Sequence, residues 1–275
     1  MKSDADAPER ELIRVGDRAL AADLAVCAIV SVAIAAASDH LLLMTILVPL
    51  LQIARLITWQ SLGSEQRGTA SARAEVAFCV LCTVLGATND WISVVRHRIY
   101  DYQVPVWYPA WSTIPLWMLL YWGSVLRAMA SLAGWERLSS GLAQRNEVRF
   151  HGRAVRSAPL KIALELLLVI STRQCIYRWY LDPLWSWLPF AVALLAYVKL
   201  FPRSCRDWLF AAIVLCVGPA VEVIYIQVGW LHRYHLGWIA GVPLWIVLWW
   251  VLASWVWRDL APRLQQALAR ALPAR

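Results

Sequence analysis

Long apolar runs alternate with short polar segments along most of the chain. An apolar run of about 20 residues is long enough for an α-helix to cross the hydrocarbon core of a bilayer. We expect eight such helices, over residues 19–38, 41–59, 74–95, 113–132, 158–176, 184–201, 207–228 and 238–257. The pattern therefore predicts an all-α, polytopic membrane protein with about eight transmembrane helices.

Polar segments divide the chain into two groups of helices. Residues 1–18 form a polar leader without an apolar core, so no cleavable signal peptide is evident. The basic segment 133–157 separates a first group of four helices, 19–132, from a second group, 158–257. Residues 258–275 form a basic tail, which we expect to lie on the membrane as a short amphipathic helix.

Charge supports this class and predicts an orientation. Only 16% of the residues are charged, against about 25% in average globular proteins. With the N-terminus in the cytoplasm, all but five of the 26 Lys and Arg residues fall in cytoplasmic segments or the helix ends beside them. The exceptions are Arg96, Arg98, Arg173, Arg178 and Arg233. Such an excess is the rule for cytoplasmic loops. The net charge of +8 then reflects topology and contact with anionic membrane lipid, so we expect no nucleic-acid partner.

One phrase of sequence occurs in both groups of helices. In each copy an acid follows a glycine by four residues, a tyrosine follows the acid by twelve, and Pro-Leu-Trp opens the next helix. The first copy runs through Gly86, Asp90, Tyr102 and Trp117, and the second through Gly218, Glu222, Tyr234 and Trp245. Because a unit of four spans keeps its orientation when it is duplicated, we expect two parallel four-helix repeats, related by an axis roughly along the membrane normal.

The repeated acids, Asp90 and Glu222, are the candidate catalytic residues. A charged carboxyl at the bilayer centre costs about 2.5–3.5 kcal/mol on insertion scales, so an acid in such a place usually has a function. A protonated acid in an apolar cavity is a proton donor, and an ionised partner stabilises developing positive charge. The alternative is that each acid pairs with an arginine, such as Arg96 or Arg233, and only fixes helix packing.

Aromatic and polar residues near the acids are candidates for substrate binding. Tryptophan faces attract cations, so Trp117 and Trp245 would suit a cavity for a carbocation. A lipid-facing tryptophan array explains the same residues. The other candidates, chosen for their place in the phrase or on the same helix face as an acid, are Asn89, Arg96, His97, Tyr102, Tyr225 and Tyr234.

The histidines and cysteines do not predict a metal site. The chain has five His in all, and Cys79-x-x-Cys82 lacks a second Cys or His pair. We therefore expect neither a metal ion nor another cofactor.

The segment from Gly218 to Trp250 resembles the bacterial membrane carotenoid hydratase family. The shared residues are Gly218, Glu222, Gly229, Tyr234 and Gly241-Val242-Pro243. The resemblance implies a polyene or isoprenoid substrate, acid-assisted addition of water and a place in the bacterial inner membrane. The first copy departs from the family, with Asp90 as its acid and Ile114 before its proline. Asn89-Asp90-Trp91 is similar in type to small integral membrane terpene cyclases, which use acids from separate helices.

Three classes of function fit these observations. The leading hypothesis is a membrane enzyme, a lyase or an isomerase, that hydrates or cyclises a hydrophobic isoprenoid or polyene lipid through a cation-like intermediate. A proton-coupled transporter is the second, because paired acids at a repeat interface suit proton coupling. The third is a non-catalytic membrane assembly protein, in which the repeat serves packing alone.

Overall fold

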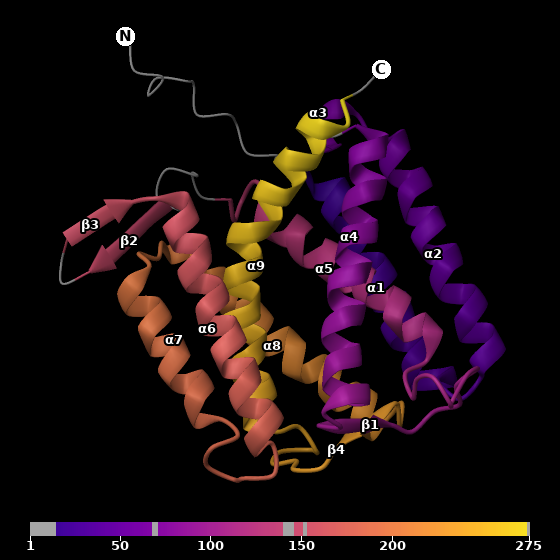
Figure 1. Ribbon diagram of the computed structural model, residues 1–275. Helices are drawn as coiled ribbons and strands as arrows, with labels where there is room; N and C mark the ends of the chain where they lie inside the picture. The colour runs from indigo at the N-terminus through magenta and orange to yellow at the C-terminus, as the bar shows by residue number, and fades with distance from the viewer. Residues whose placement is uncertain (1–14, 68–70, 140–145, 151–152, 274–275) are drawn as a thin grey trace.

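A computed structural model describes residues 15–67, 71–139, 146–150 and 153–273, and helices dominate it (Figure 1). The long helices are α1 Asp17–Ala37, α2 Leu41–Ser61, α4 Ala72–Trp91, α5 Leu116–Gly134, α6 Ala158–Trp179, α7 Leu188–Leu200, α8 Cys205–Gln227 and α9 Leu244–Ala271. Each of the eight expected helices thus has a counterpart. A short helix, α3 Ser64–Arg67, follows α2, and a π-helical segment, η2 Ile92–Arg96, extends α4. The predicted leader lies outside the described residues up to position 14.

The described helices identify a multi-pass membrane protein. By length and composition, six can cross a membrane: α1, α2, α4 with η2, α5, α8 and α9. Helix α7 is apolar but has only 13 residues, and α6 carries four charged residues, Lys161, Glu165, Arg173 and Arg178. Exposed leucine, isoleucine and valine side chains are numerous on the helix surfaces. A surface of this kind suits contact with hydrocarbon.

Helices α5 and α9 lie at the centre and contact each other (Figure 1). In the first half, α1, α2 and α4 pack on α5, and α1 packs on α2. In the second half, α6, α7 and α8 pack on α9, and α6 packs on α7. Further contacts, between α4 and α9 and between α1 and α8, join the halves.

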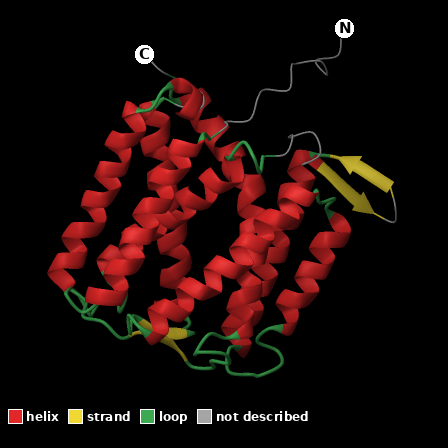
Figure 2. Cartoon of the chain, turned by 180° about the vertical axis from the view of Figure 1, so that it is seen from behind, coloured by secondary structure: helices red, strands yellow, loops and turns green. Residues whose placement is uncertain are grey.

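Two three-residue strands connect the halves at one end of the bundle (Figure 2). Strand β1, Tyr100–Tyr102, pairs antiparallel with β4, His232–Tyr234. In this register Tyr100 is opposite Tyr234, Asp101 is opposite Arg233, and Tyr102 is opposite His232. We call β1 and β4 the strand pair.

The segment between the halves contains a β-hairpin that the all-α expectation did not include. Strands β2, Glu147–Phe150, and β3, Arg153–Arg156, pair antiparallel beside α6 and α7. Val148 is fully buried, whereas Arg149 and Phe150 are exposed. Residues 140–145 and 151–152 of the predicted linker lie outside the described residues.

The last helix is longer than expected. We expected a span that ends at residue 257 and a separate surface helix after it, whereas α9 continues without a break to Ala271. Trp257 and Ala261 pack in a cluster with Phe78 of α4, and Arg258 is fully buried. The Nε of Arg258 lies 2.8 Å from Asp207 Oδ1, so an ion pair holds this part of α9 inside the protein.

Candidate functional site

The two acids of the repeated phrase are buried near the ends of α4 and α8. Asp90 has no exposed surface, and the hydroxyls of Tyr100 and Tyr102 each donate a hydrogen bond to its carboxylate. Glu222 is 6% exposed, and its Oε2 lies 3.0 Å from His232 Nε2 and 3.3 Å from the Tyr234 hydroxyl. In both halves the two partners come ten and twelve residues after the acid.

A tight turn in each half brings the partner side chains back to the acid. Arg98 and Trp230 each precede a strand by two residues, and both have left-handed backbones, with φ of 51° and 46°. This conformation is strained for residues other than glycine and concentrates at functional sites. The π-helical segment before Arg98 is a second feature that is frequent at such sites.

The two half-sites meet in one group of rings. The Tyr100 ring centroid lies 5.1 Å from that of Tyr234 and 5.4 Å from that of His232, and Tyr102 lies 6.0 Å from His232. We call the acids and their four partners the strand-pair cluster; it consists of Asp90, Tyr100, Tyr102, Glu222, His232 and Tyr234. The acids therefore converge on shared rings.

The phenols of this cluster stay protonated at neutral pH. Burial raises the pKa of Tyr100, Tyr102 and Tyr234 well above the usual value of a tyrosine. The neighbouring carboxyl, Asp90 for the first two and Glu222 for the third, raises the pKa further. Each phenol is thus a stable hydrogen-bond donor.

The alternative in which arginines pair with the two acids finds no support in the described part of the chain. No arginine lies within ion-pair distance of either carboxylate there, and Arg96 and Arg233 are exposed.

Tryptophans pack behind the strand-pair cluster. Trp122 and Trp250 stack on each other, with ring centroids 6.5 Å apart. Each also lies against the glycine of its own copy of the phrase. A Cβ at Gly86 would lie 2.6 Å from Trp122 Cβ, and a Cβ at Gly218 would lie 2.9 Å from the Trp250 ring. Only glycine allows this close approach.

Buried nitrogens in this region that are without a hydrogen-bond partner among the described residues include Trp117 Nε1, Trp250 Nε1 and His232 Nδ1. Buried polar atoms normally have partners, so these donors and acceptors are available to a ligand.

The other predicted substrate-binding residues are more scattered. Trp245 is buried and meets the Tyr234 ring edge-on at 5.7 Å, so it borders the cluster. Tyr225 instead belongs to a separate hydrogen-bonded group, 2.8 Å from the Ser31 hydroxyl and 3.0 Å from the Tyr121 hydroxyl. Trp117 is fully buried in the core.

Residues at the end of α4 are outside the cluster. His97 stacks on Tyr177 at 4.0 Å, and burial, followed by the nearby charges of Arg96 and Arg173, lowers its pKa. Asn89 is half-buried, and its carbonyl oxygen accepts a hydrogen bond from Ser93.

Arg173 is a buried cation beside this region. Its guanidinium donates to the hydroxyls of Ser93 and Tyr177 and lies over the rings of Tyr177 and Trp249, at 4.8 and 4.9 Å. It forms no ion pair with a carboxylate within the described ranges.

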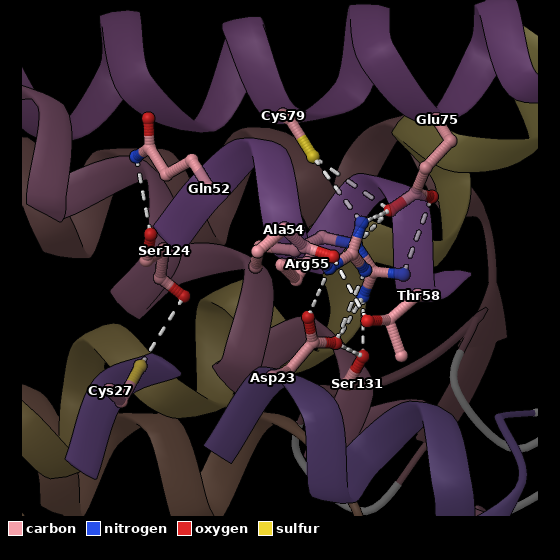
Figure 3. Close-up of polar contacts among 11 residues, drawn as sticks. Asp23, Cys27, Gln52, Ala54, Arg55, Thr58, Glu75, Cys79, Ser124 and Ser131 are labelled. Carbon is pink, nitrogen blue, oxygen red and sulfur yellow. Dashed lines mark hydrogen bonds and ion pairs between the residues drawn. The ribbon is translucent and has the colours of Figure 1, made fainter. Parts of the chain in front are cut away.

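A second buried polar group was not anticipated from the sequence (Figure 3). Asp23, Arg55, Glu75 and Arg127, from four different helices, are each at most 6% exposed; we call them the charge cluster. Arg55 Nε lies 2.5 Å from Asp23 Oδ1, and Arg127 Nε lies 2.7 Å from Glu75 Oε1. Each guanidinium also contacts the other carboxylate, so the charges balance. The feature of the sequence that could have indicated this cluster is a charged residue inside each of four apolar runs.

A cavity of about 370 Å³ borders the charge cluster. Its lining comes from α1, α2, α4 and α5 and includes no member of the strand-pair cluster. The apolar lining consists of Val26, Leu56, Val76, Val80, Val84 and Leu120. Gln52, Thr83 and Ser124 add polar groups.

No group of three or more His, Cys, Asp and Glu in the described ranges is arranged to hold a metal ion. Comparison of the chain with protein-family models, with curated proteins and with solved structures found no match.

Proposed function

We propose that this chain is an integral membrane enzyme that acts on a hydrophobic isoprenoid or polyene lipid by acid-assisted chemistry. The observation that carries the proposal is the convergence of two buried carboxyls on one cluster of aromatic rings. Burial in apolar surroundings favours the neutral form of a carboxyl, and aromatic faces stabilise cations when water is excluded. These are the requirements for protonating a carbon–carbon double bond.

The environments of the two acids suggest different roles. Asp90 accepts hydrogen bonds from two neutral tyrosine hydroxyls and serves as the proton donor. The electron pair of the double bond forms a C–H bond with this proton and leaves a cation on the adjacent carbon. Glu222, beside His232, is the ionised partner and base. In hydration, water attacks the cation and passes a proton to Glu222; in cyclisation, a second double bond attacks and an adjacent C–H bond gives up the proton.

The proposal includes eight spans in two parallel repeats, with both termini in the cytoplasm of a bacterial inner membrane. The repeated packing on α5 and α9, and the left-handed residues before both strands, support it. The register of the strand pair fits a two-fold axis that passes between Asp101 and Arg233. At 1.5 Å per residue α7 is about 20 Å long, which requires a locally thinner bilayer.

Product analysis in whole cells tests the enzymatic role. The chain is expressed in a host that makes isoprenoids and polyenes, and extracted lipids are compared by liquid chromatography and mass spectrometry. Asp90→Asn and Glu222→Gln should each abolish a new product at unchanged protein level. Asp39→Asn is the matched control, because the Asp39 side chain is 75% exposed. Wild-type product from both cluster variants would refute the proposal.

A proton-coupled transporter is the second candidate. The tyrosines and His232 form a continuous series of titratable groups between two buried acids, and such series act as proton relays in membrane proteins. Uptake into proteoliposomes that requires a pH gradient and is lost with Glu222→Gln, with no product in the cell assay, would favour this function. Failure of the acid variants to assemble into a larger complex would instead indicate an assembly protein.

A further inference from the structure

The cavity beside the charge cluster opens toward the lipid. Three of its lining valines lie on one face of α4, and they are exposed: Val76 by 43%, Val80 by 57% and Val84 by 55%. Helix α2 packs mainly on α1 and α5, and it reaches α4 through the contact of Arg55 with Glu75. A hydrophobic molecule in the bilayer therefore reaches the cavity from the side, without crossing water.

The polar lining has unused hydrogen-bonding capacity. The Gln52 amide nitrogen donates to the Leu120 carbonyl oxygen at 2.7 Å. It also donates to the Ser124 hydroxyl at 3.2 Å (Figure 3). Within the described part of the chain, Gln52 Oε1 receives no hydrogen bond and the Ser124 hydroxyl proton has no acceptor. One acceptor and one donor are thus adjacent, as a hydroxyl group requires.

The charge cluster at the same cavity argues against a charged ligand. Its two arginines and two acids neutralise one another through close contacts on both carboxylates. A phosphate or ammonium group would add an unpaired charge in a low-dielectric environment, at a large cost in free energy. An uncharged polar group carries no such cost.

We propose that this cavity is a binding site for a lipid alcohol, with the apolar chain along the α4 valines and the hydroxyl between Gln52 Oε1 and the Ser124 hydroxyl. Its volume falls in the range of about 300–1,000 Å³ that is common for small-molecule sites. The site goes beyond the proposed reaction, because it shares no residue with the strand-pair cluster.

Binding of tritiated farnesol to the purified full chain in nanodiscs tests the site. We expect saturable binding that unlabelled farnesol competes away. Farnesyl phosphate and the hydrocarbon farnesene should each compete at least tenfold less well than farnesol. Ser124→Ala and Gln52→Leu should each weaken binding by roughly threefold to tenfold, the effect of one lost hydrogen bond.

A steric variant tests the position of the opening. Val80→Phe should weaken binding at least tenfold, whereas Val192→Phe should not change it, since Val192 is also 57% exposed but lies on α7. Both variants must elute as folded protein in gel filtration. Unchanged binding to Val80→Phe, or equal competition by farnesene, would overturn the proposal.

Discussion

Removal of one arginine from the charge cluster is expected to destabilise the protein strongly. Arg127 is 4% exposed and forms two bonds with Glu75, from Nε at 2.7 Å and from Nη2 at 3.3 Å. Its Nη1 donates to the Ser131 hydroxyl at 2.5 Å and lies 3.5 Å from Asp23 Oδ2. Arg127→Met therefore leaves two buried carboxylates with one guanidinium, Arg55.

The expected loss is large because the remaining charge cannot be hydrated. Breaking a buried ion pair by removing one partner costs about 3–5 kcal/mol. Removing Glu75 as well restores neutrality, so the double variant Glu75→Gln/Arg127→Met should be more stable than Arg127→Met alone. Contacting charged residues couple by about 0.5–3 kcal/mol, and we expect a value near the upper end.

Equilibrium unfolding by SDS in mixed micelles, followed by circular dichroism, measures these free energies of unfolding. Arg137→Met is the matched control, because Arg137 pairs with Asp17 at 3.4 Å but both side chains are more than 60% exposed. Exposed pairs contribute about 0–1 kcal/mol. A loss below about 1 kcal/mol for Arg127→Met, or a double variant that is less stable than Arg127→Met, would refute the reasoning.

Three further predictions follow from the strand end of the bundle. Gly218→Val should destabilise the protein by about 1–3 kcal/mol, because the new side chain overlaps with Trp250. Ala220→Val, on the exposed face of α8, should not destabilise it. Equal effects of the two variants in SDS unfolding would contradict this prediction. The tyrosines of the strand-pair cluster have raised pKa values in the folded state, so they stabilise the fold fully below about pH 10. As the pH rises further, this stabilisation should fall by up to about 4 kcal/mol per pH unit for three phenols. Tyrosinate absorbance that appears near pH 10 for all tyrosines of the folded protein would exclude this prediction. Arg173→Met should change stability by less than about 1 kcal/mol. Losing the cation–π contacts destabilises the protein, whereas removing a buried charge that has no carboxylate partner among the described residues stabilises it, and the two effects offset each other. A loss of stability as large as that of Arg127→Met would disprove this prediction.

The helices could be predicted because long apolar runs carry a strong local signal. The predicted ends differ from the observed ones by a few residues, as for 207–228 against Cys205–Gln227. The matched spacing named Tyr102 and Tyr234 as candidates beside the acids, and in the structure each tyrosine donates a hydrogen bond to the acid of its own half. Whether these acids act on an isoprenoid stays a prediction.

Contacts between distant segments could not be predicted. The Ser131 hydroxyl donates a hydrogen bond to Asp23, 108 positions away, and the sequence around either residue does not predict this bond. Strands of three residues have too little pattern to predict the pairing of β1 with β4. The end of α9 was misread as a surface helix because its basic residues suggested solvent. Its Arg258 is buried, with Asp207, 51 positions earlier, as an ion-pair partner.

The middle position of the strand pair bears on how such a molecule can arise. When a strand pairs antiparallel with its own counterpart, one position lies opposite itself. In an assembly of two identical chains, that position holds the same side chain twice, and two like charges there would repel. Joining both copies in one chain removes this restriction. Asp101 of the first copy lies opposite Arg233 of the second, an arrangement of unlike charges that no symmetric pair of identical chains can reach.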